Sequence, residues 1–247
     1  MRFEICVDSM EGVRAAHDAG ADRVELCAAL VEGGITPNLG LIRMARAVPD
    51  LRLQVMIRPR GGDFLYSDDE IEQMLVDIAV AKAEGADGAV FGLLLPDGTI
   101  DVEKTKRLID AARPMQVTFH RAFDLAADPV TSLQVLIDLH VERVLTSGQE
   151  ETALKGLPLI CDLIRRADGQ IIVMPGGGIN SGNARLIARQ SGCREMHFAA
   201  LLPAESAMKF RRFNIPMGAP LGGKLGEYAR TITTRTAIRA IMDRAQS

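Results

Sequence analysis

Two short segments near the start of the chain carry a carboxylate and a thiol two residues apart, at Glu4 and Cys6 and again at Glu25 and Cys27. Because side chains alternate between the two faces of a β-strand, each carboxylate would share a face with its thiol. Adjacent parallel strands lie about 4.8 Å apart, so the two pairs would lie side by side if these segments form neighbouring strands.

Other segments alternate polar and apolar residues in the same way, although strands of a parallel α/β sheet usually read as hydrophobic runs. Their polar faces carry Gln54, Met56, Arg58 and Arg60, then Gln116, Thr118 and His120, and finally Glu195 and His197. With the apolar faces packed on helices, these polar faces are expected to point into the interior of the fold.

Two explanations account for so many interior charges, each of which costs several kcal/mol unless it is paired. Glu4, Glu25, Glu195, Arg58 and His120 could neutralise one another as an ion network that fills the core. Alternatively, they form a ligand or reaction site. We favour the site, because ionisable groups gathered in a concavity usually mark one.

As a reaction site, these groups would suit proton transfer on a small anion. Arg58 and Arg60 would hold a carboxylate or phosphate as bidentate donors, and Glu25, Glu4 or His120 would move the proton. This is the chemistry of an isomerase, epimerase or lyase that acts on a small anionic or phosphorylated metabolite. A Schiff-base mechanism is disfavoured, because all six lysines fall outside the predicted strands.

Three consecutive glycines, Gly176, Gly177 and Gly178, follow a predicted strand and precede a predicted helix. Backbone N–H groups in such a loop can cradle an anion, and phosphate commonly binds at this place in α/β barrels. The glycines are therefore predicted to bind an anion. An ordinary tight turn between strand and helix is the alternative.

The elements that would position these residues repeat along the whole chain. Eight β-rich runs alternate with stretches of helical periodicity, at residues 3–7, 23–26, 53–57, 88–93, 116–120, 143–146, 171–174 and 195–198. Ser67 three residues before Glu70 predicts a capping box, and Asp128 before a proline predicts another helix start. This alternation predicts one (β/α)₈ TIM barrel that spans residues 1–247 as a single domain. A doubly wound open sheet is the alternative.

The segment after the eighth predicted strand departs from this regular pattern. Residues 203–224 contain several prolines and glycines, and we expect an elaborated loop there with a short helix. A final helix is predicted over residues 225–244. The loop would lie on the side of the barrel where active sites are built, because it follows a strand.

Composition excludes several classes of protein. The 247 residues are 47% hydrophobic and 25% charged, with a net charge of −3 and only 4% aromatics, so no basic stripe for nucleic acid is expected. The longest apolar run, residues 89–95, is far shorter than the roughly 20 residues of a membrane span. Glu4 interrupts what would be the apolar stretch of a signal peptide, so we expect a cytoplasmic protein whose cysteines are thiols.

Six segments also resemble the CutC family, which is named for copper homeostasis. They are Glu4-Ile-Cys-Val-Asp-Ser9, Asp22-Arg-Val-Glu-Leu-Cys27, Glu32-Gly-Gly-Ile-Thr-Pro37, Ile57-Arg-Pro-Arg-Gly-Gly-Asp-Phe64, Thr118-Phe-His-Arg-Ala-Phe-Asp124 and Arg143-Val-Leu-Thr-Ser-Gly-Gln149. The resemblance extends from residue 2 to about residue 200. It implies a cytoplasmic (β/α)₈ barrel, often a homo-oligomer, that binds copper. The metal ligands that the resemblance implies are Cys6 and Cys27, which match cysteines of the family; thiolates select Cu(I), and Met56 or His197 could supply a third ligand. Structural packing of the two cysteines is the alternative, because cysteine is among the most buried residue types. No established reaction comes with it.

Overall fold

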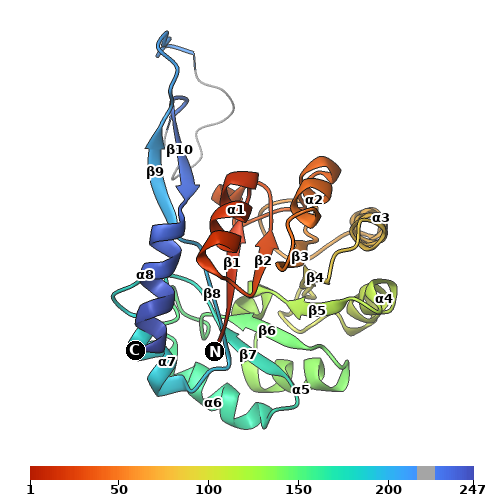
Figure 1. Ribbon diagram of the computed structural model, residues 1–247. Coiled ribbons are helices and arrows are strands. Elements are labelled where there is room, and N and C mark those ends of the chain that lie inside the picture. Colours follow the sequence, from red (N-terminus) through yellow and green to blue (C-terminus); the bar gives the residue numbers. More distant parts are fainter. Residues whose placement is uncertain (216–225) are drawn as a thin grey trace.

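The computed structural model describes residues 1–215 and 226–247, and eight of its strands form one parallel sheet (Figure 1). These strands are β1 (Arg2–Val7), β2 (Arg23–Leu26), β3 (Arg52–Met56), β4 (Gly88–Phe91), β5 (Gln116–Phe119), β6 (Arg143–Thr146), β7 (Ile172–Pro175) and β8 (Glu195–Phe198). Each strand lies within two residues of its predicted position.

Helices alternate with these strands as the periodicity predicted. They are α1 (Met10–Ala19), α2 (Leu39–Arg46), α3 (Asp68–Ala83), α4 (Val102–Ala112), α5 (Pro129–Asp138), α6 (Leu157–Ala167), α7 (Ala184–Ser191) and α8 (Arg235–Gln246), with 3₁₀ turns η1 (Leu30–Glu32) and η2 (Arg121–Leu125). The capping box at the start of α3 is confirmed, because Ser67 and Glu70 exchange backbone-to-side-chain hydrogen bonds. Asp128 caps α5, as predicted.

The strand order distinguishes a barrel from a doubly wound sheet. It runs β7-β6-β5-β4-β3-β2-β1-β8, so β1 pairs with both β2 and β8. The edge strands β7 and β8 contact each other, which brings the sheet to a nearly closed barrel. A doubly wound sheet would change direction in mid-order. The TIM barrel is therefore confirmed, while its extent over residues 1–247 stays a prediction.

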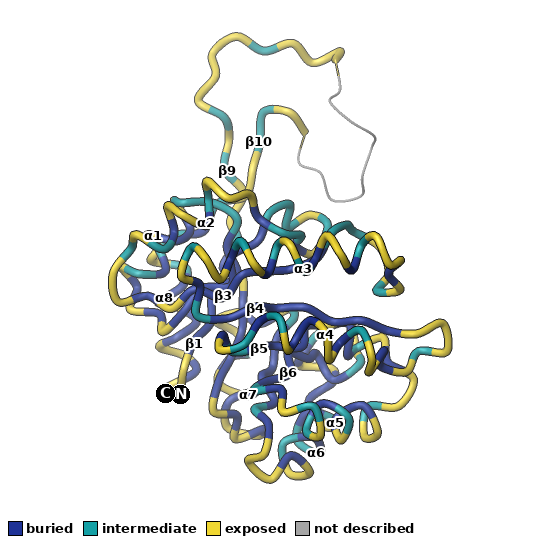
Figure 2. The backbone as a smooth tube through the Cα atoms, turned by 90° about the vertical axis from the view of Figure 1, so that its right-hand side faces the viewer, coloured by how far each residue is buried: buried dark blue, intermediate teal, exposed yellow. Residues whose placement is uncertain are grey.

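The strands separate an apolar layer, which packs against the helices, from a polar interior of the barrel. Phe3, Ile5 and Val7 of β1 are buried within the main hydrophobic cluster, which also includes buried residues of the surrounding helices. Figure 2 shows the strands as a buried centre and the helices with one exposed side. The alternate positions of the strands carry buried polar residues instead. This alternation aims the candidate site residues into the barrel.

The segment after β8 is an elaboration of the barrel, as predicted, but its described residues contain two strands where a loop with a short helix and the start of the last helix were predicted. β9 (Leu201–Glu205) and β10 (Ala229–Thr233) pair as an antiparallel hairpin that projects from the barrel, and we call residues 201–215 and 226–233 the arm (Figure 1). Residues 203–215 contain no helix, and the remainder of the predicted loop, 216–224, lies outside the described residues. The β-branched run at residues 231–233 favours a strand.

The last helix therefore begins ten residues later than predicted, at Arg235 rather than at residue 225. Thr234 caps it, because its hydroxyl accepts a hydrogen bond from the Ala237 N–H. The helix packs against α1 and α7, where the eighth helix of a barrel belongs. Among the described residues, no helix has the length and apolar character needed to cross a membrane.

Candidate functional site

The polar interior of the barrel has two parts, and the part nearer the N-terminal ends of the strands is a group of paired charges. We call Glu4, Arg23, Arg143 and Glu195 the ionic layer. Arg23 forms ion pairs with both Glu4 and Glu195, and Arg143 Nε donates to Glu195 Oε2 at 3.0 Å. All four side chains are almost completely buried. Part of the predicted interior charge is thus a paired network.

The electrostatics of the ionic layer keep its carboxylates charged. Burial opposes ionisation of Glu4, but Arg23 and the nearby His197 outweigh it and lower the pKa of Glu4 to about 2. Burial likewise opposes ionisation of Glu195, and Arg23 and Arg143 lower its pKa. Removal of one partner would leave an uncompensated buried charge.

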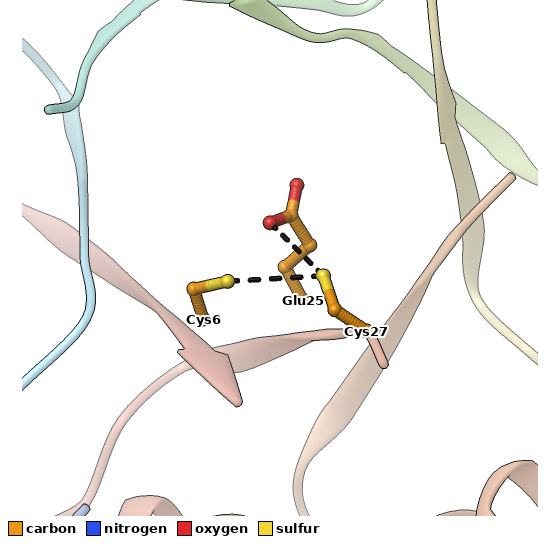
Figure 3. A group of neighbouring side chains, drawn as sticks. All are labelled: Cys6, Glu25 and Cys27. Carbon is orange, nitrogen blue, oxygen red and sulfur yellow. Dashed lines mark hydrogen bonds between the residues drawn. The ribbon is translucent and has the colours of Figure 1, made fainter. Parts of the chain in front are cut away.

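The second part lies nearer the carboxyl ends of the strands and centres on two thiols. The Sγ atoms of Cys6 and Cys27 are 3.7 Å apart, and Cys27 donates to Glu25 Oε2 at 3.6 Å (Figure 3). Since a thiol has one proton, this arrangement has Cys6 donating to Cys27. The cysteines come from the end of β1 and the residue after β2, where both are buried. The structure thus brings the two predicted metal ligands together.

A cavity of about 100 Å³ lies beside Cys6, and we call it the thiol pocket. Its lining includes Cys6, Glu25, Met56, Arg58, His120 and His197. Most of the interior residues predicted to form a site therefore surround one hollow. Cys6 and Cys27 also share an apolar cluster with Met56, whereas His197 faces the carboxylates.

His197 connects the two parts of the interior. Its Nδ1 lies 2.8 Å from Glu4 Oε1, and its Nε2 lies 3.8 Å from Glu25 Oε2. Burial lowers the pKa of His197, but Glu25, Cys6 and Glu4 more than compensate and hold it well above its usual value. His197 is therefore a buried cation between two carboxylates.

Four other ionisable groups in this part of the interior are shifted toward their neutral forms. The neighbouring Cys27 and burial raise the pKa of Cys6 well above its usual value. Cys6 lowers the pKa of Cys27, but burial and Glu25 raise it to about 11. Burial raises the pKa of Glu25 despite the opposing charge of His197. Burial and the charge of Arg58 lower the pKa of His120 to about 3.

The two arginines predicted to bind an anion lie in different surroundings. Arg58 donates to the backbone carbonyls of Glu32, Gly34 and Gly62 at 2.7–2.9 Å, which ties the loops after β2 and β3 together. Arg60 lies outside the barrel interior and bonds to Glu70 and to groups of its own loop. The structure therefore places Arg58 at the pocket and Arg60 away from it.

The glycine loop lies at the mouth of the barrel beside a second cavity of about 230 Å³. Gly176 donates its N–H to Thr146 O, whereas Gly177 and Gly178 line the cavity and their N–H groups bond to no other described residue. Cys6 and His197 line this cavity as well as the thiol pocket, so the two hollows adjoin. Two of the three predicted glycines thus face the site.

Sequence reasoning missed Arg121, which lines both hollows. Asp124 accepts from Arg121 Nε at 2.7 Å and from the Ser147 N–H at 3.0 Å, so it fixes the arginine and joins the loops after β5 and β6. Arg23 and Arg143 were missed too. Each begins a strand, and Arg23 precedes Glu25 by two residues, so strict period-two counting would have placed it inside the barrel.

A larger hollow, of about 1080 Å³, lies elsewhere, between α4 and α5 on the outside of the barrel. Its lining includes Leu95, Val102, Lys104, Asp128 and Val135. Asp128 there caps α5, and Lys104 pairs with Asp68. None of the predicted site residues lines this groove. Most of them line the two smaller hollows in the barrel instead.

Comparison with known proteins shows which family the chain resembles. The model of the CutC family matches residues 1–201. A human protein named copper homeostasis protein cutC homolog is 50% identical over 239 residues, covering 97% of this chain and 87% of its own. A CutC family protein of Mesorhizobium japonicum is 48% identical over 246 residues, covering 99% and 94%.

A solved structure agrees with the sequence matches. The putative copper homeostasis protein CutC from Streptococcus agalactiae superposes with a TM-score of 0.77 at 32% identity. The match covers 80% of this chain and 98% of that one. The family model reaches only to the first residue of the arm. The chain belongs to the CutC family.

Proposed function

We propose that this protein binds Cu(I) through Cys6 and Cys27 and serves in copper homeostasis in a reducing cytoplasm. The observation that carries the proposal is the pair of buried thiols 3.7 Å apart, of which Cys6 lines a cavity. Thiolates select Cu(I) over harder cations. The names of the family and of its human and bacterial members support the same metal.

The separation of the thiols suits a bent site with a third donor. With metal–sulfur bonds of about 2.3 Å, two sulfur atoms 3.7 Å apart subtend an angle of about 107° at a shared ion. Met56 is the best placed soft donor, because it packs in the same cluster as both thiols. His197 is less suited, because its raised pKa keeps it protonated.

The loop after β2 closes over this donor set. Gly34 has a φ of +89°, and a Cβ at this position would lie 3.0 Å from Cys27 Sγ and 3.6 Å from the Met56 methyl carbon. A side chain there would press on the sulfur atoms, so glycine is required for the loop to cover them. Both thiols have raised pKa values, and Cu(I) would therefore displace their protons on binding.

A competition titration against a Cu(I) chelator tests the proposal. We expect the Cys6→Ser/Cys27→Ser variant to lose more than about 100-fold in Cu(I) affinity, the upper end of what loss of an outer-shell partner costs. The matched control is Cys161→Ser/Cys193→Ser, which changes the other two cysteines and should bind as the wild type does. Equal affinity in the wild type and in Cys6→Ser/Cys27→Ser would refute copper binding at this pair.

A second candidate function is proton transfer on a small anionic metabolite, by an isomerase, epimerase or lyase. The observation that favours it is Glu25, whose raised pKa and position on a cavity suit a general acid or base. Glu4 suits this role less, because both of its oxygens are engaged by Arg23 and His197. His120 has a pKa of about 3 and is better suited to donate a hydrogen bond.

We also propose that the protein is a homo-oligomer that covers the apolar side chains of the arm. Phe210 and Phe213 are 69% and 81% exposed, and Ile215 is also exposed. A two-stranded hairpin is marginally stable alone in water. The arm of a second copy, with the same apolar residues, would bury them; sedimentation equilibrium of the wild type and of Phe213→Ser measures this.

A further inference from the structure

Three buried polar atoms around the thiol pocket have no partner. Nine buried side-chain nitrogen or oxygen atoms among the described residues lack a hydrogen bond, and Glu25 Oε1, Arg58 Nε and His120 Nε2 are three of them. All three belong to residues that line the 100 Å³ cavity. Buried polar atoms in native proteins are nearly always bonded to protein, water or a ligand. The pocket is therefore built to receive a polar group.

The hydrogen-bonding roles of these atoms define that group. The Ala122 N–H donates to His120 Nδ1 at 3.2 Å, so the proton of the neutral imidazole lies on Nε2. His120 Nε2 and Arg58 Nε both donate, whereas Glu25 Oε1 accepts. A hydroxyl group satisfies both kinds of neighbour, because it accepts and donates at once.

The adjoining cavity of about 230 Å³, which we call the mouth cavity, is suited to an anionic group instead. Arg121 uses Nε and Nη2 to bond Asp124 and Ser147. Its Nη1 lies near the glycine loop, because a Cβ on Gly177 would be 3.3 Å from it. Together with the N–H groups of Gly177 and Gly178, this guanidinium makes a place for an anionic group.

We propose that the thiol pocket and the mouth cavity together bind a small hydroxylated organic anion. Its carboxylate or phosphate lies against Arg121 and the N–H groups of Gly177 and Gly178. Its hydroxyl lies inside, between His120, Arg58 and Glu25. His197 lines both hollows, which places them side by side. This site specifies the anionic ligand of the second candidate function, on which it rests, and does not depend on copper binding.

Three related compounds test this binding by isothermal titration calorimetry and by thermal shift. Glycerol 3-phosphate and glycerate carry the two anionic groups on similar three-carbon hydroxylated chains, and glycerol has no anionic group. We expect at least one anion to bind and to raise the melting temperature, while glycerol does neither. The anion that binds with the higher affinity shows whether the mouth cavity prefers a phosphate or a carboxylate. Equal behaviour of all three compounds, or no binding by either anion, would overturn the proposal.

Two substitutions of His120 separate its roles. The side-chain oxygen of His120→Asn can still accept from the Ala122 N–H, but no donor reaches the cavity. The amide nitrogen of His120→Gln can approximate the position of the lost Nε2–H. We expect anion affinity to fall by about 10-fold in His120→Asn, the cost of one hydrogen bond, and to be largely retained in His120→Gln. Unchanged affinity in a folded His120→Asn would contradict the inner half of the site.

The outer half is tested by Arg121→Gln, which should remove the preference for an anion over glycerol. Cu(I) affinity is measured in the same variants, because neither His120 nor Arg121 is a proposed copper ligand. We expect it to stay at the wild-type value in all three. Loss of anion binding with intact copper binding bears on this site alone. Failure of the wild type to bind copper, with anion binding present, bears on the copper proposal alone.

Discussion

The ionic layer and the thiol pocket occupy the same barrel interior but differ in how far their polar groups have partners. In the ionic layer, Arg23 and Arg143 pair with Glu4 and Glu195. In the thiol pocket, atoms of Glu25, Arg58 and His120 have no partner, and a cavity lies beside them. Each charge of the ionic layer has an opposite charge beside it, although Glu195 Oε1 lacks a hydrogen bond, whereas three polar atoms of residues that line the pocket are unpartnered. If the proposed binding site is correct, stability and binding are separated along the barrel axis.

The largest expected effect comes from breaking the ionic layer. Arg23→Met keeps a long side chain but leaves Glu4 and Glu195 without their shared cation. We expect the free energy of unfolding to fall by about 3–5 kcal/mol, the usual cost of removing one member of a buried ion pair. Urea denaturation at neutral pH measures this change.

The matched control is Arg230→Met, because Arg230 pairs with Glu11 at the surface and both side chains are about half exposed. Such exposed pairs contribute less than about 1 kcal/mol. If the two variants lost similar stability, the ionic layer would not be the stabilising half of the interior.

Acid should weaken the fold by a comparable amount. The pKa of Glu4 falls from 4.5 to about 2 on folding, so its contribution is present above pH 4.5 and lost as the pH falls toward 2. The pKa of His120 falls from 6.5 to about 3, so its contribution is lost as the pH falls from 6.5 toward 3. Each shift corresponds to roughly 3 kcal/mol or more.

Unfolding free energies measured at pH 7, 5 and 3.5 check this dependence. His120→Asn should remove the part of the decline that begins near pH 6.5 and leave the part below pH 4.5. A stability that is flat between pH 7 and 3.5 would show that neither buried group is held in its assigned state.

The smallest effect is expected from Glu25→Gln in the thiol pocket. The folded protein raises the pKa of Glu25, so ionised Glu25 opposes folding above pH 4.5, and a neutral isostere removes that cost. We expect unfolding stability within about 1 kcal/mol of the wild type, or above it, since functional groups are often held at the expense of stability. A loss as large as that of Arg23→Met would erase the distinction between the two regions.

Much of the site was predictable because it depends on local pattern. Alternation at Glu4 and Cys6, and again at Glu25 and Cys27, correctly placed these side chains in the interior. Which charges pair could not be predicted, because Arg23 reaches Glu195 across 172 positions of sequence. The same limit applies to Arg58, whose donors are taken by carbonyls of two loops.

The arm shows a different limit of sequence reasoning. Its prolines and glycines favour a loop, yet β9 and β10 pair with each other rather than with the barrel. The periodicity that revealed eight repeated units has no equivalent in a single hairpin outside the repeat. Correct prediction of the barrel therefore gave no information about this segment.

The pairing of the arm has a consequence for engineering. Leu201 and Thr233 lie opposite each other at its base, so the chain leaves the barrel and returns to it at one point. The length between these two residues does not alter the span that must be bridged before α8 begins. Residues 202–232 could accordingly be replaced by a tight turn or by a reporter peptide. The barrel would then serve as a host for inserted segments.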